Sequence, residues 1–205
     1  MYKFIKKTIQ ATIINIIVAL FSTIAFFAII YLLFGQKIDD TISLIDKVSI
    51  DIENKQQTQL VLDEQNKIKT YPEYGTQYAT IEIPKIDVDL PVYFGDTLDV
   101  LKNGVGHSSG SYFPGEGGTI IYMGHNSLKV FRRFSELQIG NEIIVKTDYK
   151  EFKYKIYDMR LIKETELDKL PIQKEKEILM VYTCYPFNNI GYTDRRYVVY
   201  AELEK

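Results

Sequence analysis

The sequence predicts a mostly β domain preceded by one membrane-spanning helix, and three observations lead to this fold class. The first is a long uncharged apolar run near the N-terminus, and the second is a series of short alternating segments from Tyr78 onward. The third is the set of Gly, Pro, Asn and Asp residues that divide these segments. Seven or eight short strands within residues 78–205 are typical of a compact β-barrel or sandwich.

The N-terminal apolar run is long enough to cross a bilayer. No charged residue occurs from Thr8 to Gln36, and residues 11–34 are almost wholly apolar. About 20 residues at 1.5 Å each span a hydrocarbon core of roughly 30 Å. The competing interpretation is a cleaved signal peptide, whose apolar region has about 7–15 residues and precedes a small-residue cleavage site. This run is longer and no such site follows Phe34, so we expect an uncleaved signal anchor.

The charges around this run predict its orientation. Three lysines precede it, whereas the lysine that follows is accompanied at once by two aspartates: Lys3, Lys6 and Lys7 against Lys37, Asp39 and Asp40. Because positive charge is retained on the cytoplasmic side, residues 1–10 are expected inside the cell. The chain is then a single-pass protein of the cell membrane, with its bulk outside the cell and the lipid bilayer as one partner.

Residues 35–77 are predicted to be an extracellular juxtamembrane stalk. This stretch is polar, with isolated apolar residues such as Ile38, Ile42 and Ile45 at spacings of three and four. That spacing suits one stripe of an amphipathic helix, but the later part has no clear period. We expect a linker that is part helical and part flexible, followed by one domain over residues 78–205.

The domain is predicted to be built from short strands. Runs of period two, or short apolar runs rich in Ile, Val, Tyr and Phe, are strand signals when turn residues bound them. Turns are expected at Gly140-Asn141 and Asp148–Lys150, and short helical pieces at Leu128–Leu137 and Glu164–Leu170. The expected strands are Ala79–Pro84, Val88–Tyr93, Thr119–Met123, Glu142–Lys146, Phe152–Arg160, Ile178–Thr183 and Tyr197–Leu203.

Composition excludes several classes of protein. Lys plus Arg is 25 and Asp plus Glu is 27, so the formal net charge is −2 and a strongly basic nucleic-acid binder is not the leading hypothesis. One Cys cannot form an intrachain disulfide. Two His and one Cys cannot close a zinc site without carboxylates, and no acidic spacing indicates calcium. We therefore expect no metal and no cofactor.

The candidate chemistry centres on Cys184, at the exit of an apolar run. From the residues alone it is a nucleophile, a buried spectator or one half of an intermolecular disulfide. A thiol nucleophile needs a proton donor for its leaving group, and the chain offers His125, directly after a strand, and His107, in a Gly- and Ser-rich loop. Arg195 and Arg196 are candidate oxyanion donors, or ordinary surface charges.

Several motifs resemble those of the sortases, the membrane-anchored cysteine transpeptidases of Gram-positive cell surfaces. IEIPKIDVDLPV at Ile81–Val92 is similar to the opening strands of that family. The segment GVGHSSGSYFPGEGGTIIYMGHNS resembles its G-x-G-H…PG-E-x-G…GH pattern, which ends at His125. The T-L-x-T-C motif falls on Met180–Cys184, where Met and Val replace the first Thr and the Leu. TCYPF is most similar to class D sortases.

The resemblance implies an eight-stranded sortase-type β-barrel with a defined set of catalytic residues. Cys184 would attack the carbonyl after Thr in an LPxT-type sorting signal, and His125 would exchange protons with the leaving and incoming amines. The family's arginine stands five residues before an alanine, which selects Arg196 from the pair because Ala201 follows in that register. Thr183 is implied as a helper in substrate binding.

The resemblance also implies the partners. They are secreted proteins that carry a C-terminal LPxT-type sorting signal, and an amine of a peptidoglycan precursor that receives them. A Leu-Pro pair needs an apolar slot, so we expect the groove between the connection Lys163–Lys176 and the loop Tyr185–Asp194. The candidate lining residues are Leu167, Leu170, Pro171 and Ile172.

Two other functions are weighed against the transpeptidase. A membrane-tethered binding or sensor domain with an inactive barrel predicts the loss of Cys, His or Arg from the set, and none is lost. A plain cysteine hydrolase uses the same residues, because water can also resolve a thioester. The long N-terminal lid of pilus-assembling sortases is not evident in residues 37–77, which favours a housekeeping or sporulation role.

Overall fold

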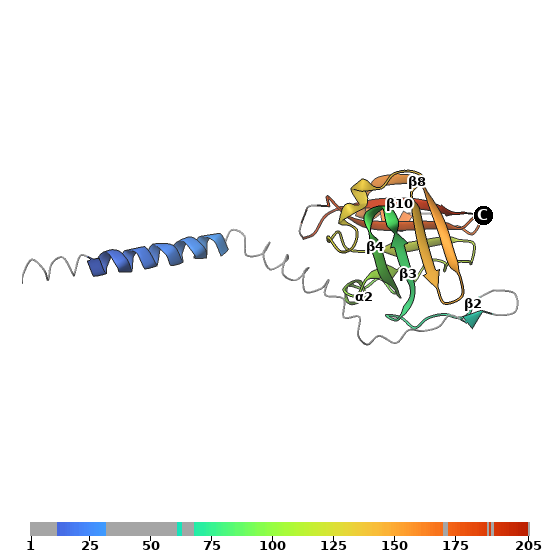
Figure 1. Ribbon diagram of the computed structural model, residues 1–205, viewed down its shortest axis with the longest axis horizontal. Helices are drawn as coiled ribbons and strands as arrows, with labels where there is room; N and C mark the ends of the chain where they lie inside the picture. Colours follow the sequence, from blue (N-terminus) through green and yellow to red (C-terminus); the bar gives the residue numbers. More distant parts are fainter. Residues whose placement is uncertain are drawn as a thin grey trace, which may run out of the picture. The chain divides into compact units, whose positions relative to one another are not determined.

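The computed structural model describes residues 12–31, 61–62, 68–169, 172–187, 189 and 191–204. The chain divides into two units, with the boundary between Ser43 and Leu44 (Figure 1). In the first unit, residues Thr12–Tyr31 form a helix that is long and apolar enough to cross a membrane, as expected. The ends of the predicted span, residues 1–10 and most of the predicted linker lie outside the described residues.

The second unit is a closed β-barrel. In the described residues, eight strands join in the order β10-β8-β7-β3-β4-β5-β6-β9, which confirms the predicted mostly β fold and decides between barrel and sandwich. The strands are β3 (Gln77–Ile83), β4 (Val88–Phe94), β5 (Val105–His107), β6 (Thr119–Met123), β7 (Glu142–Thr147), β8 (Glu151–Lys163), β9 (Ile178–Tyr185) and β10 (Arg195–Leu203).

The remaining elements are short. They are η1 (Pro84–Ile86), α2 (Leu98–Leu101), η2 (Arg132–Glu136) and η3 (Glu164–Lys169), with a small pair of strands, β1 (Val61–Leu62) and β2 (Ile68–Thr70). Both predicted helical pieces of the domain are therefore single stretches of 3-10 helix. Just after β2, the ring of Tyr71 packs on Phe113 and its hydroxyl donates to Glu116 at 2.6 Å, so this part of the predicted linker contacts the barrel.

The sequence patterns missed one strand of the barrel. His107 was expected in a loop, but it ends β5, which pairs in parallel with β4 and antiparallel with β6. β5 has three residues and its middle residue is Gly106, so it carries too few side chains to show a period. Its pairing is nevertheless essential, because β5 joins β4 to β6 and closes the barrel.

Alternation along the strands gives the barrel an inner and an outer face. All eight strands contribute to the inner core, for example through Val181 on β9 and Val199 on β10. Residues one step away face outward. On β6, β9 and β10 these form a second, smaller group, here named the outer cluster: Ile121, Met123, Met180, Val198 and Tyr200.

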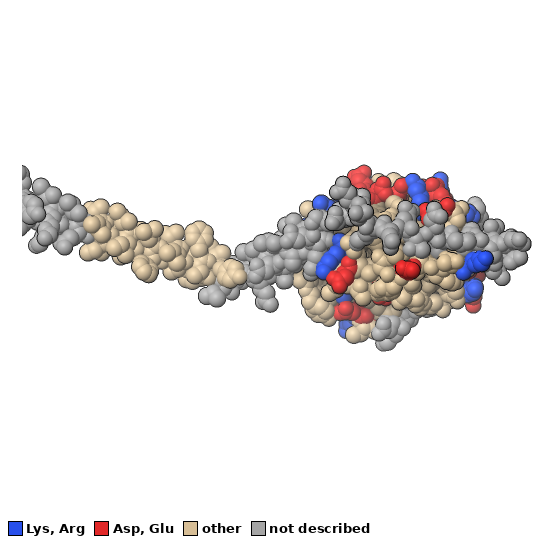
Figure 2. Space-filling model, turned by 90° about the horizontal axis from the view of Figure 1, so that it is seen from below, with Lys and Arg blue, Asp and Glu red and all other residues tan. Residues whose placement is uncertain are grey.

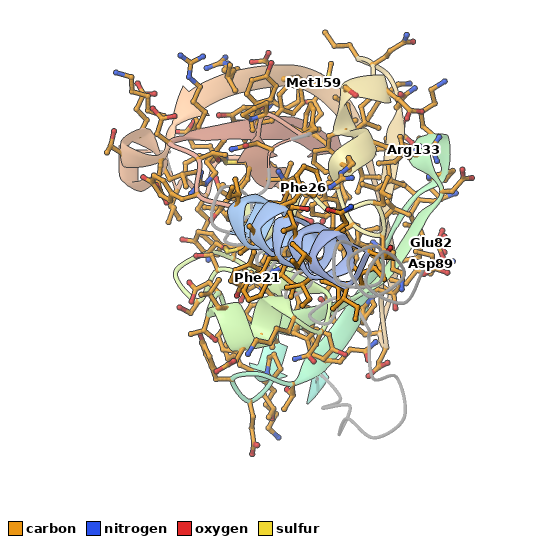
Figure 3. The ribbon with its side chains drawn as sticks, turned by 90° about the vertical axis from the view of Figure 1, so that its left-hand side faces the viewer. Phe21, Phe26, Glu82, Asp89, Arg133 and Met159 are labelled. Atoms are coloured by element: carbon orange, nitrogen blue, oxygen red, sulfur yellow. The ribbon has the colours of Figure 1, made fainter. Side chains whose placement is uncertain are left out.

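The barrel surface is polar, in contrast to the N-terminal helix. Figure 2 shows acidic and basic side chains interspersed on one face of the barrel unit and none on the helix. Glu82 and Asp89, directly opposite each other on β3 and β4, point outward in Figure 3, as do Phe21 and Phe26 from the helix. A surface with charges of both signs is suited to contact with water, and an uninterrupted apolar surface is suited to contact with lipid.

Glu177, the residue before β9, fixes the glycine-rich loop at one end of the barrel. Its carboxylate accepts hydrogen bonds from the backbone N–H of Gly115 and Gly117, both at 3.0 Å, and from the hydroxyl of Tyr154 at 2.6 Å. Both glycines have positive φ, of 92° and 81°, a conformation that disfavours other residues. The PGEGG part of the motif is therefore structural here.

The described parts of the connection from β8 to β9 contact the starts of two strands, β10 and β6. At its start, the N–H of Glu164 donates to the carbonyl of Asp194 at 2.8 Å, beside the first residue of β10. Near its end, Gln173 accepts from the N–H of Thr119 at 2.9 Å, at the first residue of β6. Four residue steps separate Thr119 from Met123, which corresponds to about 13 Å of strand.

Candidate active site

The pairing of β9 with β10 places Cys184 opposite Arg196. The two residues are direct partners in this antiparallel pair, whereas Arg195 is the partner of Tyr185. Directly opposite residues point to the same face, with Cβ atoms about 4.5–5.5 Å apart. Arg196 therefore shares a face with the thiol, and Arg195 belongs to the other face.

His125 approaches Cys184 from the other side. β6 runs parallel to β9 with Met123 beside Tyr182, and extending this register by two residues places His125 beside Cys184. Two hydrogen bonds continue the pairing of β6 with β9 beyond Met123. The N–H of Gly124 donates to the Tyr182 carbonyl at 3.2 Å, and the hydroxyl of Thr183 donates to the Gly124 carbonyl at 2.8 Å. The barrel order places β9 between β6 and β10, so Cys184 lies between the other two candidates.

The guanidinium of Arg196 is almost buried and strongly hydrogen-bonded. Its Nη1 donates to the carbonyls of Thr193 at 2.7 Å and Arg195 at 2.9 Å. Its Nη2 donates to a carboxylate oxygen of Glu164, the first residue of η3. The second oxygen of Glu164 accepts from the hydroxyl of Tyr192 at 2.8 Å, and this hydrogen bond raises the pKa of Tyr192. Sequence reasoning did not find Glu164 or Tyr192.

Thr183 lies on the opposite face from Cys184. It is 1% exposed, and its hydroxyl bonds to the backbone of the segment that carries His125. Consecutive residues of a strand alternate in direction, so the neighbour of an outward thiol points inward. Thr183, the predicted helper in substrate binding, therefore contacts the Gly124-His125 segment from the face opposite the thiol.

Asn126 is a further residue that sequence reasoning missed. Its side chain is 7% exposed, and Nδ2 donates to the carbonyls of Pro186 and Asn189, both at 3.2 Å. These bonds join the loop after His125 to the loop after Cys184. A single Asn beside a loop His carries no signal of this in the sequence, because the partners lie 60 and 63 residues away.

The predicted groove residues fall in different places. Leu167 is half-buried on η3, near the start of the connection, whereas Leu170 and Pro171 lie outside the described residues. Ile172 is 51% exposed and precedes Gln173, so it lies toward the Thr119 end of β6. It lines a cavity of about 460 Å³ together with Tyr71, Phe94, Tyr112, Phe113 and Lys174, among others.

The predicted loop after Cys184 also lines a cavity, of about 460 Å³. Its walls include Tyr185 and Arg195, which face the other side of the strands from Cys184. On the Cys184 side lies instead the outer cluster, whose residues are buried and against which Tyr182 packs. The hydroxyl of Tyr182 contacts the sulfur of Met123 at 3.3 Å. Alternation in the sequence, counted from Cys184, was the signal that could have found this cluster.

His107 is the second histidine, and it is fully buried. Its Nδ1 bonds to the hydroxyl of Tyr78 at 2.8 Å and its Nε2 to the hydroxyl of Ser111 at 2.9 Å. Tyr78 in turn bonds to the hydroxyl of Tyr122 at 2.8 Å. Burial lowers the pKa of His107 to about 3, so this imidazole is neutral at physiological pH.

The described residues contain no group of three or more His, Cys, Asp or Glu side chains that is arranged to hold a metal ion. The candidate site brings a thiol, an imidazole and a guanidinium to one end of the barrel. A thiol between a proton donor and a fixed cation is suited to acyl transfer through a covalent intermediate.

Comparison with known proteins defines the class. The sortase domain family matches residues 81–204. Sortase D of Bacillus subtilis (strain 168) is 39% identical over 137 residues, which are 67% of this chain and 69% of that protein. The chain therefore belongs to the sortase family and is a cysteine transpeptidase.

Solved structures agree with this assignment. The Sortase D5 transpeptidase of Clostridium perfringens superposes with a TM-score of 0.60 and 32% identity, covering 66% of this chain and 83% of that one. Sortase A of Corynebacterium diphtheriae, a lid mutant, gives a TM-score of 0.57 and 26% identity, covering 62% and 70%. Within the family, similarity to two sortases D fits class D.

Proposed function

We propose that this sortase cleaves an LPxT-type sorting signal after its Thr and transfers the cleaved protein to an amine of a peptidoglycan precursor. The observation that carries the proposal is the register that sets Cys184 opposite Arg196 on one side and beside the continuation of β6 to His125 on the other. Two strand residues and the histidine that follows a third strand lie at one end of the barrel.

In the first half of the proposed reaction, the Cys184 thiolate attacks the carbonyl carbon that follows Thr. The carbonyl oxygen takes up negative charge, and the Arg196 guanidinium stabilises it. The C–N bond then breaks as the His125 imidazolium gives its proton to the departing amine. The products are a thioacyl-enzyme and the C-terminal fragment of the substrate.

In the second half, the acceptor amine attacks the thioester carbon. His125, neutral after the first half, takes the proton from the amine, and the carbon–sulfur bond breaks to restore the Cys184 thiolate. A new amide joins the substrate protein to the acceptor. Water in place of the amine gives a free carboxylate, so hydrolysis is the expected side reaction.

The outer face of β6 and β9 supports an extended peptide substrate. Its apolar residues are largely buried and lie on the same side as Cys184, and the described parts of the β8–β9 connection, which carry Leu167 and Ile172, contact the starts of β10 and β6. Four residues of an extended signal cover about 13 Å, which matches the four residue steps from Thr119 to Met123. We propose that the Leu-Pro pair binds here, with Leu170 and Pro171 contributed by the connection.

The membrane helix gives the site a location. We propose a single-pass orientation with residues 1–10 in the cytoplasm and the barrel, from residue 78, outside the cell. The charge difference across the span supports this direction. Tethering would hold the enzyme where secreted substrates and lipid-linked precursors meet.

The test uses the full chain in detergent with a library of LPxT-containing peptides, with and without a competing amine. Mass spectrometry should detect cleavage after Thr, a covalent adduct on Cys184 and, with the amine, the joined product. Cys184→Ala is the control for the adduct. Cleavage at another bond, or a product that never incorporates amine, would contradict the proposed transfer.

A further inference from the structure

The contact between Glu164 and Arg196 joins two segments that are distant in sequence. Glu164 begins η3 in the β8–β9 connection, and Arg196 is the second residue of β10, 32 residues later. The Arg196 side chain is 10% exposed and that of Glu164 is 39% exposed. A charged group this buried needs a partner, since desolvation without one costs several kcal/mol.

The hydrogen bonds on Arg196 fix the plane of its guanidinium. Nη1 is held by the backbone carbonyls of Thr193 and Arg195, on the strand's own N-terminal end. Nη2 is held from the other direction by Glu164. Within the described part of the chain, Nε and the second hydrogen of Nη2 have no acceptor, so these are the donors left for a substrate oxygen.

Glu164 also joins the two loops beside the site. One of its oxygens bonds to Arg196, and the other accepts from the hydroxyl of Tyr192 at 2.8 Å, in the β9–β10 loop. Its backbone N–H donates to Asp194 of the same loop at 2.8 Å. One residue therefore ties the connection that carries Leu167 to both the loop and the arginine.

We infer that Glu164 is a positioning residue for transpeptidation: it holds the guanidinium of Arg196 in the orientation that meets the developing oxyanion. The inference rests on the proposed role of Arg196. Because the oxyanion forms only in the transition state, a misplaced guanidinium should lower kcat more than it raises KM. For this positioning, Arg196 requires an acceptor oxygen at residue 164, held in place by a second polar atom that bonds to Tyr192.

The experiment compares three variants of the full chain, assayed with an LPxT peptide that the wild type turns over. Glu164→Ala removes the contact and should lower kcat about tenfold with KM little changed, less than the 10²–10³-fold typical for losing the donor itself. Glu164→Gln keeps an oxygen for Arg196 and a polar group for Tyr192, and should stay within about threefold of wild type.

Glu166→Ala is the matched control. Glu166 lies in the same 3-10 segment and accepts from the N–H of Lys163 at 2.7 Å, but it does not contact Arg196. It should leave kcat near the wild-type value. A loss equal to that of Glu164→Ala would mean that folding of the connection, and not the position of Arg196, is responsible. Equal losses in Glu164→Gln and Glu164→Ala would also overturn the inference.

A double variant separates this inference from the proposed function. If Glu164 acts through Arg196, Glu164→Ala should cause no further loss in an Arg196→Ala background. Multiplied losses would show an independent role for Glu164 and refute the positioning role alone. A normal kcat in Arg196→Ala itself would refute the proposed role of Arg196. Where the Arg196→Ala rate falls below detection, the difference between Glu164→Ala and Glu164→Gln decides.

Discussion

The two histidines of this chain lie at the ends of two paired strands, β5 and β6, in opposite surroundings. His107 lies inside, opposite Tyr122 of β6, where both ring nitrogens are bonded to hydroxyl groups and water is excluded. His125 lies three residues after Tyr122, half-buried in the loop that continues β6. Identical side chains thus occupy a structural and a candidate catalytic position, and the face of the sheet makes the difference.

Burial decides whether an imidazole can take up a proton, and the two histidines differ in burial. Inside the barrel, a charged imidazole would lose its hydration, so the pKa of His107 is lowered to about 3 and the ring stays neutral. On the outer face, the Cys184 thiol is half-buried and the Arg196 side chain is 10% exposed. An acid–base group must change its protonation state, and the complete burial of His107 opposes that change.

The largest effect should come from the outer thiol. Cys184→Ala is expected to abolish transpeptidation, while the unfolding transition of the barrel shifts little because a half-buried side chain of small volume is shortened by one atom. Peptide turnover and thermal unfolding are measured on the same preparation. Substantial residual transfer would remove Cys184 from the mechanism.

The two histidines should separate activity from stability. His125→Ala is expected to lower kcat/KM by about 10²–10⁴-fold, the usual value of general acid–base help, with little change in stability. His107→Gln should instead destabilise the barrel, since one amide cannot serve both Tyr78 and Ser111, while the folded fraction stays active. The opposite pattern, with activity lost at His107 and retained at His125, would reverse the assignment.

The next largest effect is expected at the adjacent arginines, whose alanine variants should differ in kcat. Arg196→Ala is expected to lower kcat about 10²–10³-fold, as for the loss of one oxyanion donor. Arg196→Lys should also be poor, because an ammonium cannot contact Glu164, the Thr193 carbonyl and a substrate together. Arg195→Ala, on the exposed opposite face, is the control and should remain near wild type. If Arg195→Ala is the impaired variant, the substrate binds on the other face.

The smallest expected effect is the pH dependence that His107 gives to the free energy of unfolding. Below pH 6.5 the unfolded chain binds a proton at this residue, whereas folded His107 does so only near pH 3. The contribution of His107 to the free energy of unfolding is therefore complete above pH 6.5. It decreases by about 1.4 kcal/mol per pH unit as the pH falls toward 3. Urea unfolding at pH 6.5 and pH 5 should differ by about 2 kcal/mol more in wild type than in His107→Gln. Equal differences would mean that His107 titrates normally.

The sequence by itself determined the features that depend on local order. Alternation and turn residues predicted most strands, and an uncharged run predicted the N-terminal helix. The choice of Arg196 came from the resemblance to sortases, through the position of Ala201, and the pairing of Arg196 with Cys184 is consistent with it. Alternation places Thr183 and Cys184 on opposite faces, although Thr183 was expected to help at the site of the Cys184 nucleophile. These properties depend on a few consecutive residues, because backbone geometry alone sets the direction of successive side chains.

Only the tertiary structure decided which distant groups meet. β5 has too few side chains to show a period, and it becomes a strand because the barrel closes through it. The contacts of Glu164 with Arg196 and Tyr192, and of Asn126 with the loop after Cys184, join residues 28 to 63 positions apart. Such neighbours depend on how the strands order themselves around the barrel, and no local pattern records that order.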